Sequence, residues 1–254
     1  MSDTILIVGA TSSIAKAVAH RFASSGSNLI LAGRDETELS LIATDIGVRW
    51  NVNAVSSYFS ALDYAHHDTF FADCERDHGP IRGVVVALGY LGDHALAKRE
   101  FAEAETIFNT NFTACASLLN VVAHAFEGND AADNKRERGK FICVISSVAG
   151  DRGRQSNYYY GAAKGALSIY LQGLRNRLHS SNVTVTTVKP GFVDTKMTFG
   201  TPGMFLLADP TDVAEGIHRA VQKRRHVVYL PAFWRGIMFI FRSIPETVFK
   251  RLRL

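Results

Sequence analysis

A chain of 254 residues allows one domain or at most two, and with 47% hydrophobic residues it can bury a sizeable core. No stretch is apolar for long enough to span a membrane, and the N-terminus lacks the basic segment and cleavage site of an export signal. The three cysteines, Cys74, Cys115 and Cys143, are odd in number and widely spaced, which argues against a disulfide framework or a zinc site. We therefore expect a cytoplasmic protein with no metal.

The net charge of +4 is unevenly distributed along the chain. From Val221 to the C-terminus there are eight Lys or Arg residues and one Glu, so this end is strongly basic and the rest is mildly acidic. A basic segment of this kind can meet nucleic acid, anionic lipid or phosphate. Charge alone leaves the choice among these partners open.

The N-terminal segment predicts a strand, a tight turn and an amphipathic helix. Residues 4–8 are apolar and mostly β-branched, a glycine follows, and the helical pattern ends near residue 26. Backbone N–H groups at such a helix start form a site for pyrophosphate, and small serines there allow close approach and can add hydroxyl contacts. We assign to this dinucleotide phosphate site Gly9, Thr11, Ser12, Ser13 and Ile14.

The second predicted strand, NLILAG, ends at Gly33 and is followed by Arg34 and Asp35. In a dinucleotide-binding fold, an acidic residue at the strand end binds the ribose diol of NAD and repels a 2′-phosphate. The arginine found here can instead pair with the phosphate of NADP. We therefore expect Gly33 and Arg34 to lie at the cofactor, with NADP(H) favoured and NAD(H) as the alternative. The competing interpretation is that Arg34 is a solvated loop residue.

The middle of the chain predicts two further strands and a long helix. Residues 48–59 indicate a third strand, and IRGVVVALG indicates a fourth that is buried on both faces, as in the centre of a parallel sheet. The helix is predicted from about residue 98 to 126 and contains Asn111, although an asparagine there competes with backbone hydrogen bonding.

The strand FICVIS ends just before Ser147, and Tyr160 and Lys164 follow on the next predicted helix. Side chains four residues apart stack on one helix face. A free phenol has a pKa of about 10, and a nearby ammonium lowers that value toward the pH at which proton exchange is easy. Ser147 can hydrogen-bond a substrate oxygen as negative charge develops on it. The alternative is an ordinary surface pair of Tyr and Lys, which Ser147 and the nucleotide site disfavour.

On these residues the chain resembles the short-chain dehydrogenase/reductase family over nearly its whole length. The resemblance implies a catalytic centre in which Asn111 joins Ser147, Tyr160 and Lys164 and anchors a water that leads from Lys164 to solvent. It also implies cofactor contacts after the fourth and sixth strands, with a threonine beside the nicotinamide carboxamide. These contacts would be made by Gly89, Pro190, Gly191, Val193 and Thr195.

The sequence departs from the family pattern at two places. Only Gly9 of the three family glycines is kept, with Ser13 and Ala15 at the other two positions, although both are small. The family's N-N-A-G is here Val86 to Gly89, so the asparagines are replaced. These departures weaken the assignment to a subfamily more than they weaken the predicted fold.

Alternating strands and helices predict a Rossmann-like, doubly wound α/β domain over residues 1–231. We expect a mainly parallel, seven-stranded sheet with helices on both faces. VTVTTVKPG is the sixth strand and HVVYLP the last. Between them, residues 192–209 mix Gly, Pro, Met and Phe, which suits a mobile lid over an apolar pocket.

Residues 232–254 form a basic, apolar C-terminal tail. Its aromatic residues and cations suit a helix lying in a membrane interface, and the alternative is a helix that packs in the core or in a dimer. The aromatics alternate with aliphatics and form no stacking platform for bases, so we expect no nucleic acid partner.

Within the family, the segments GYLGD and SSVAGDRGR and the tail are similar to the ketoreductase subunit of decaprenylphosphoryl-ribose 2′-epimerase. This likeness implies reduction of a keto-sugar carried on a polyprenyl phosphate, by a cytoplasmic enzyme at the inner face of the membrane. Arg152 and Arg154 are then candidate phosphate contacts. The family resemblance implies a homodimer or homotetramer.

The expected reaction is hydride transfer between NADP(H) and a carbonyl, favouring reduction, with Tyr160 donating the proton. Two alternatives stay open. One is a reductase of soluble β-ketoacyl or small ketone substrates, and the other is a nucleotide-binding module without turnover. All four catalytic positions are filled, which argues against the second.

Overall fold

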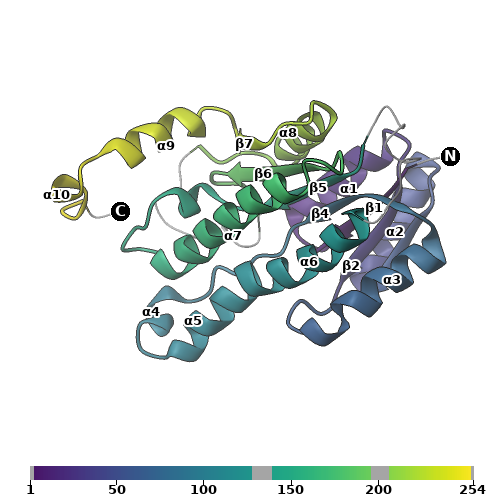
Figure 1. Cartoon of the computed structure of the whole chain (residues 1–254), viewed down its shortest axis with the longest axis horizontal. Helices are drawn as coiled ribbons and strands as arrows, with labels where there is room; N and C mark the ends of the chain where they lie inside the picture. The colour runs from purple at the N-terminus through teal and green to yellow at the C-terminus, as the bar shows by residue number, and fades with distance from the viewer. Residues whose placement is uncertain (1–2, 128–138, 196–205, 253–254) are drawn as a thin grey trace.

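Seven parallel strands form one sheet at the centre of the protein (Figure 1). The structure, a computed structural model, describes residues 3–127, 139–195 and 206–252. Every pairing between neighbouring strands is parallel, which confirms the predicted Rossmann-like, doubly wound sheet. The strands are β1 (Thr4–Val8), β2 (Asn28–Gly33), β3 (Ala54–Tyr58), β4 (Ile81–Val86), β5 (Phe141–Ile145), β6 (Thr184–Pro190) and β7 (Val227–Leu230).

Helices connect the strands and cover both faces of the sheet (Figure 1). The α-helices are α1 (Ser13–Ala23), α2 (Glu36–Trp50), α3 (His67–His78), α4 (His94–Ala97), α5 (Phe101–Phe108), α6 (Ala114–Glu127), α7 (Tyr158–Arg177), α8 (Pro210–Gln222), α9 (Trp234–Ser243) and α10 (Glu246–Phe249). Shorter turns are the 3₁₀ helices η1 (Tyr64–His66) and η4 (Val148–Asp151) and the π-helical turn η2 (Asn109–Thr113).

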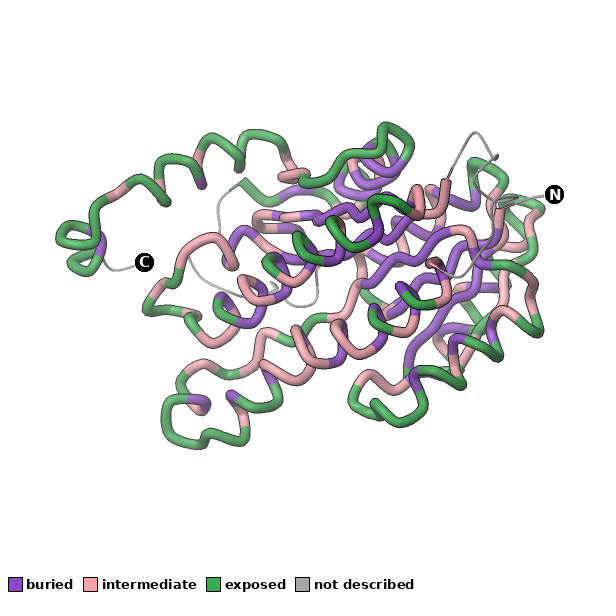
Figure 2. The backbone as a smooth tube through the Cα atoms, viewed as in Figure 1, coloured by how far each residue is buried: buried purple, intermediate pink, exposed green. Residues whose placement is uncertain are grey.

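Alternate residues of the central strands are buried on opposite faces of the sheet. In β1, Ile5 and Ile7 join the core formed with α1, α2 and α8, whereas Leu6 and Val8 join the core formed with α3, α6 and α7. All of β1 is buried, and purple marks the same central strands in Figure 2. The uninterrupted apolar runs in the sequence therefore reflect strands covered on both sides.

The strand order β3-β2-β1-β4-β5-β6-β7 reverses direction at β1. The chain runs outward from β1 to β3, returns to β4 beside β1, and then continues outward to β7. At such a switch point the connections after neighbouring strands diverge and open a crevice at the carboxyl ends of the strands. The segments that follow β1, β4, β5 and β6 all reach this edge.

The segment predicted as one helix over residues 98–126 is divided, so that prediction is wrong. α5 ends at Phe108, the π-helical turn η2 follows, and α6 begins at Ala114. Within η2, Asn111 Nδ2 donates to the backbone oxygen of Ile107 at 2.8 Å. The side-chain amide thus donates to a backbone carbonyl that would otherwise accept only from a backbone N–H of the helix. At this point the helix widens by one residue into a π-helical turn.

The C-terminal tail forms α9 and α10, and one side of α9 packs against the protein. Trp234 and Met238 are 4% and 6% exposed and form a small core with Val148. On the other side, Phe239 and Ile240 are 71% and 63% exposed, and green dominates this helix in Figure 2. Of the helices that the structure describes, none combines the length and apolarity that a membrane span needs. The lid predicted over 192–209 lies mostly outside the described residues.

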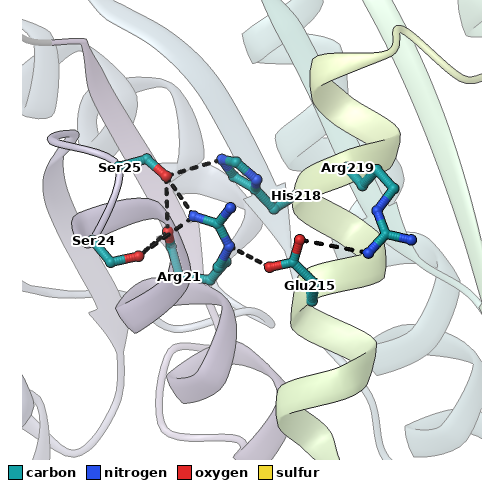
Figure 3. A network of polar contacts seen from close by, with 6 residues as sticks. All are labelled: Arg21, Ser24, Ser25, Glu215, His218 and Arg219. Carbon is teal, nitrogen blue, oxygen red and sulfur yellow. Dashed lines mark hydrogen bonds and ion pairs between the residues drawn. The ribbon is translucent and has the colours of Figure 1, made fainter.

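A polar network joins α1 to α8 across one face of the sheet (Figure 3). Arg21 forms an ion pair with Glu215, and Ser25 Oγ lies 3.2 Å from Nε2 of His218. His218 is 7% exposed, and burial, assisted by the charge of Arg21, lowers its pKa. On the opposite face, burial also lowers the pKa of His67. Both imidazoles are therefore held neutral in the folded state.

These histidines make stability depend on pH. The folded-state pKa of each lies below the ordinary value of 6.5, so the unfolded chain binds more protons below that pH. We expect the contribution of these two histidines to the free energy of unfolding to be constant above about pH 7 and to fall between about pH 6.5 and 5.5. Urea unfolding at pH 7.5 and 5.5 measures the difference in the free energy of unfolding between the two pH values. This difference should be smaller in His67→Gln and in His218→Gln than in the wild type.

His66→Gln is the matched control. Asp63 raises the pKa of this exposed histidine, so it stabilises the fold below pH 6.5, and its replacement cannot flatten the decline. A decline that is equally steep in all three variants would show that other groups cause it.

Candidate active site

The turn after β1 requires a glycine. Gly9 has φ of +78°, and a Cβ at this position would lie 2.8 Å from the carbonyl oxygen of Ala87. The N–H groups of Gly9 and Ala10 donate to Ala32 O at 2.9 and 3.1 Å, which ties the turn to β2. Ser12 then caps α1 by accepting from Ala15 N at 3.2 Å. The N-terminus of α1 is thereby held at the switch point of the sheet.

A short 3₁₀ helix places Ser147 at the end of β5. Ser147 caps η4, and its Oγ accepts from Ala149 N at 3.1 Å. A Cβ on Gly150 would lie 2.6 Å from the backbone nitrogen of Gly165, so η4 rests directly on the backbone of α7. This close packing brings the hydroxyl after β5 to the first turns of α7.

Tyr160 lies near the start of α7, and its phenol lines the same cavity as Ser147. Burial raises the pKa of the phenol to about 12, and the nearby hydroxyl of Ser147 offsets only part of this effect. The sequence argument that Lys164 lowers the pKa below its ordinary value is therefore wrong, because desolvation is the larger effect. The phenol is protonated at neutral pH, as a proton donor must be.

Lys164 is 2% exposed and is held by backbone carbonyls. Its Nζ donates to Leu88 O at 3.0 Å and to Ile145 O at 3.1 Å, beyond β4 and at the end of β5. The same nitrogen lies 5.9 Å from the centroid of the Tyr160 ring. Burial lowers the pKa of Lys164. Because an ammonium has three N–H donors, one remains for a group in the adjoining cavity.

Asn111 is fully buried, and its side chain bonds only to the backbone. Its Nδ2 donates to Tyr90 O at 2.7 Å as well as to Ile107 O, and its Oδ1 accepts from Tyr90 N at 3.2 Å. The amide therefore holds the π-helical turn to the loop after β4. Its side chain does not line the cavity that Tyr160 and Lys164 share, so any contribution to a proton path runs through the backbone it positions.

A cavity of about 690 Å³ opens at the carboxyl edge of the sheet, and most of its lining is apolar. The lining brings together several predicted residues: Ser12, Ser13, Ile14, Gly89, Ser147, Tyr160, Lys164, Pro190, Gly191, Val193 and Thr195. The others lie around it. Gly9 and Thr11 shape the turn before α1, whereas Gly33 and the exposed Arg34 stand at the end of β2.

Arg152 fastens the tail to the loop that follows η4. Its Nη1 donates to Phe241 O and Ile244 O, both at 2.6 Å, and its Nη2 pairs with Glu246 Oε2 at 2.9 Å. The guanidinium also stacks over the ring of Phe249, 3.7 Å from the centroid. These hydrogen bonds therefore go to the tail, and the phosphate contact expected of Arg152 from the sequence stays a prediction.

The family model for short chain dehydrogenases matches residues 3–202. The chain belongs to the short-chain dehydrogenase family. An uncharacterized oxidoreductase of Mycobacterium tuberculosis is 34% identical over 256 residues, covering 99% of each chain. Another, of Streptomyces coelicolor, is 29% identical over 255 residues, covering 98% of this chain and 95% of the relative. A solved variant of actinorhodin polyketide ketoreductase with NADPH has a TM-score of 0.78 at 20% identity, covering 91% and 97% of the two chains, a likeness of fold.

The residues of this short-chain dehydrogenase fit a nicotinamide dinucleotide. The Gly9 turn has no Cβ to obstruct the backbone, and the capped N-terminus of α1 offers N–H groups and two serine hydroxyls to a pyrophosphate. Ser12 and Ser13 line the same cavity as Tyr160 and Lys164. Groups that are able to bind a phosphate and a group that is able to donate a proton therefore line one cavity.

Sequence reasoning did not find the cavity wall formed by the tail of this dehydrogenase. Trp234, Ile237, Met238 and Phe241 of α9 line the cavity, and a Cβ on Gly191 would lie 1.9 Å from Trp234 Nε1. The spacing of these four residues, i, i+3, i+4 and i+7, is that of one helix face and was visible in the sequence. The spacing does not indicate the surface against which that helix face packs.

Proposed function

We propose that the protein is an NADP(H)-dependent reductase of a bulky, largely apolar carbonyl substrate. The observation that carries the proposal is that Tyr160 and Ser147 line one apolar cavity of about 690 Å³, beside buried Lys164. A bound nicotinamide dinucleotide supplies the hydride. Tyr160 then donates its proton to the carbonyl oxygen, and Ser147 holds that oxygen as negative charge develops.

Lys164 and Asn111 support this proton donor. The third N–H of Lys164 is available to a ribose hydroxyl, and its charge partly compensates for the negative charge left on Tyr160 after proton transfer. Asn111 holds the π-helical turn in which a backbone carbonyl can bind the water that returns the proton. The family resemblance adds a homodimer or homotetramer to the proposal.

The preference for NADP(H) rests on Arg34. Asp35, the acid that follows it, accepts from Glu38 N at 2.9 Å and caps α2. The carboxylate of Asp35 therefore serves as the N-cap of α2. In the described part of the chain Arg34 has no hydrogen-bond or ion-pair partner, so its guanidinium is available to a 2′-phosphate.

Arg34→Ala should lower kcat/KM for NADPH by about 10- to 100-fold, the range of about 1.5–3 kcal/mol for hydrogen bonds to charged groups. The value for NADH should change little. Steady-state rates with both cofactors measure this, and Arg49→Ala removes a cation from the far end of α2 as the control. Equal losses for both cofactors would show that Arg34 does not read the 2′-phosphate.

A panel of carbonyl compounds tests the substrate class. Each buried methylene is worth about 0.8 kcal/mol, so kcat/KM should rise about tenfold with two additional methylenes that fit the cavity. NADPH oxidation is followed with small ketones, bulky ketones, β-ketoacyl thioesters and keto-sugars on polyprenyl phosphates. Equal or faster turnover of the small ketones would support the soluble-ketone alternative, and no turnover with any of them would support a nucleotide-binding module.

A lipid-linked substrate, such as a keto-sugar on a polyprenyl phosphate, is the finer form of this proposal. α9 supports it because its inner face lines the cavity while its outer face exposes Phe239 and Ile240 among cations. An interfacial helix uses aromatic and aliphatic residues with flanking arginines in this way. The helix would lie on the inner face of the membrane and bring the cavity of a cytoplasmic enzyme to the lipid.

The double substitution Phe239→Ser and Ile240→Ser should abolish sedimentation with phosphatidylglycerol vesicles and leave the melting temperature unchanged. Point substitutions are preferable to deletion of residues 232–254, because deletion also removes the cavity wall. Phosphatidylcholine vesicles control for the charge contribution. Undiminished sedimentation of the variant would exclude this face as the membrane contact, and a change in the size of the particle would instead indicate self-association.

A further inference from the structure

Arg154 lies between the catalytic cavity and a second hollow. It belongs to the loop that joins η4 to α7, and its half-buried side chain lines both the cavity of about 690 Å³ and an adjoining one of about 390 Å³. The second hollow is formed by this loop and by α10. A group held by Arg154 would therefore be in contact with the space where Tyr160 and Ser147 act.

The guanidinium of Arg154 has no partner in the part of the chain that the structure describes. No acidic side chain there pairs with it and no carbonyl oxygen accepts from it, whereas neighbouring Arg152 is occupied by the tail. Burial lowers the pKa of Arg154 with no opposing effect of an acid. The half-buried guanidinium therefore has donors available to an anionic ligand in either hollow, and such a ligand would offset the cost of partly desolvating the charge.

The charges around the second hollow favour an anion. Lys250, the residue that follows α10, lines it and adds a second cation, and the polar Gln155 faces the same space. The acid of this hollow, Glu246, is bound to Arg152 and does not neutralise Arg154. The surroundings on the catalytic side are apolar, with Met238 and Phe241 in the wall.

We propose that Arg154 binds an anionic group of the substrate, a carboxylate or a phosphate, at a distance from the carbonyl that is reduced. The apolar wall of α9 covers the part of the substrate between the two groups. This inference rests on the proposed reductase function and deepens it, because it assigns the substrate to the class of amphiphilic oxoacids or oxo-phosphates. Guanidinium groups suit both anions through paired N–H donors.

The first test compares ketones that differ only in charge. NADPH oxidation is measured with ω-1 oxo-carboxylates of increasing chain length, with their methyl esters, and with the corresponding oxoalkyl phosphates. In the wild type, kcat/KM for the best acid should exceed that for its ester by about tenfold or more. Arg154→Gln should lose this preference and keep its rate on the ester, and Arg154→Lys should keep part of it.

Arg225→Gln is the matched control, because it removes the same charge from an exposed position before β7, at the opposite edge of the sheet. It should leave the preference unchanged. Equal loss with acid and ester in Arg154→Gln, or a wild type that prefers the ester, would overturn the inference while leaving the reductase function intact. A preference for the phosphate over the carboxylate would show that the anionic group of the substrate is a phosphate, and the reverse preference would show that it is a carboxylate.

A binding measurement decides the inference even if no ketone is reduced. Trp234 lies in the cavity wall, and Trp50→Phe leaves it as the single tryptophan. In this background, with NADP⁺ present, octanoate should change the fluorescence at about tenfold lower concentration than octan-1-ol. Adding Arg154→Gln should remove the difference. Equal binding of the acid and the alcohol by the unsubstituted site would overturn the assignment of Arg154.

Discussion

Tyr160→Phe should lower kcat for carbonyl reduction by about 10²- to 10⁴-fold, the usual contribution of a positioned proton donor. The ring and its packing remain, whereas the hydroxyl that faces the cavity together with Ser147 is lost. Because burial raises the pKa of Tyr160 to about 12, the wild-type phenol keeps its proton well above neutral pH. It should therefore cause no fall in the reduction rate between about pH 6 and 9.

Single-turnover and steady-state rates with NADPH measure this effect, and titration with NADPH checks that the variant still binds the cofactor. Tyr159→Phe is the matched control, because it removes a neighbouring phenol that does not line the cavity. Unchanged kcat in Tyr160→Phe would remove Tyr160 as the proton donor. Loss of cofactor binding in the same variant would show that the ring itself is part of the cofactor site.

Gly150→Val should lower kcat by about 100-fold or more and destabilise the fold by about 1–3 kcal/mol. A Cβ at Gly150 would lie 2.6 Å from both Gly165 N and the carbonyl carbon of Lys164. These are backbone atoms, so η4 must move away from α7. Ser147 caps η4 and moves with it, away from Tyr160.

Gly153→Val is the matched control, because a Cβ at this position, three residues further along the chain, meets no atom within 4 Å. Urea unfolding and NADPH oxidation of both variants separate the loss of stability from the loss of geometry. Wild-type kcat in Gly150→Val would show that the contact between η4 and α7 does not position Ser147. A loss of equal size in Gly153→Val would point to the loop as a whole.

The order of strands and helices could be predicted because it depends on local patterns. Residues such as Leu6 and Ile7 are both apolar although they face opposite sides of the sheet, which is the pattern of a strand buried on both faces. Gly9 could be placed because its positive φ follows from the tight turn after a strand. The pair of Tyr160 and Lys164 could be placed because helical spacing alone puts them on one face.

The continuous helix predicted through Asn111 failed for a non-local reason. Tyr90, on the loop after β4, offers both a carbonyl and an N–H to the Asn111 amide. Twenty-one residues separate the two along the chain, so the contact that holds the π-helical turn has no trace in local periodicity. The partners of Arg152 are likewise about ninety residues away.

Local sequence patterns were enough to predict the α/β fold and to propose Tyr160 as a proton donor and the turn after β1 as a dinucleotide site, because backbone conformation and side-chain spacing act over a few residues. Tertiary structure alone decided the pKa of Tyr160, the occupation of Arg152 by the tail and the availability of Arg154. Desolvation and charge pairing depend on what surrounds a group in space, and those surroundings come from segments far apart in the chain.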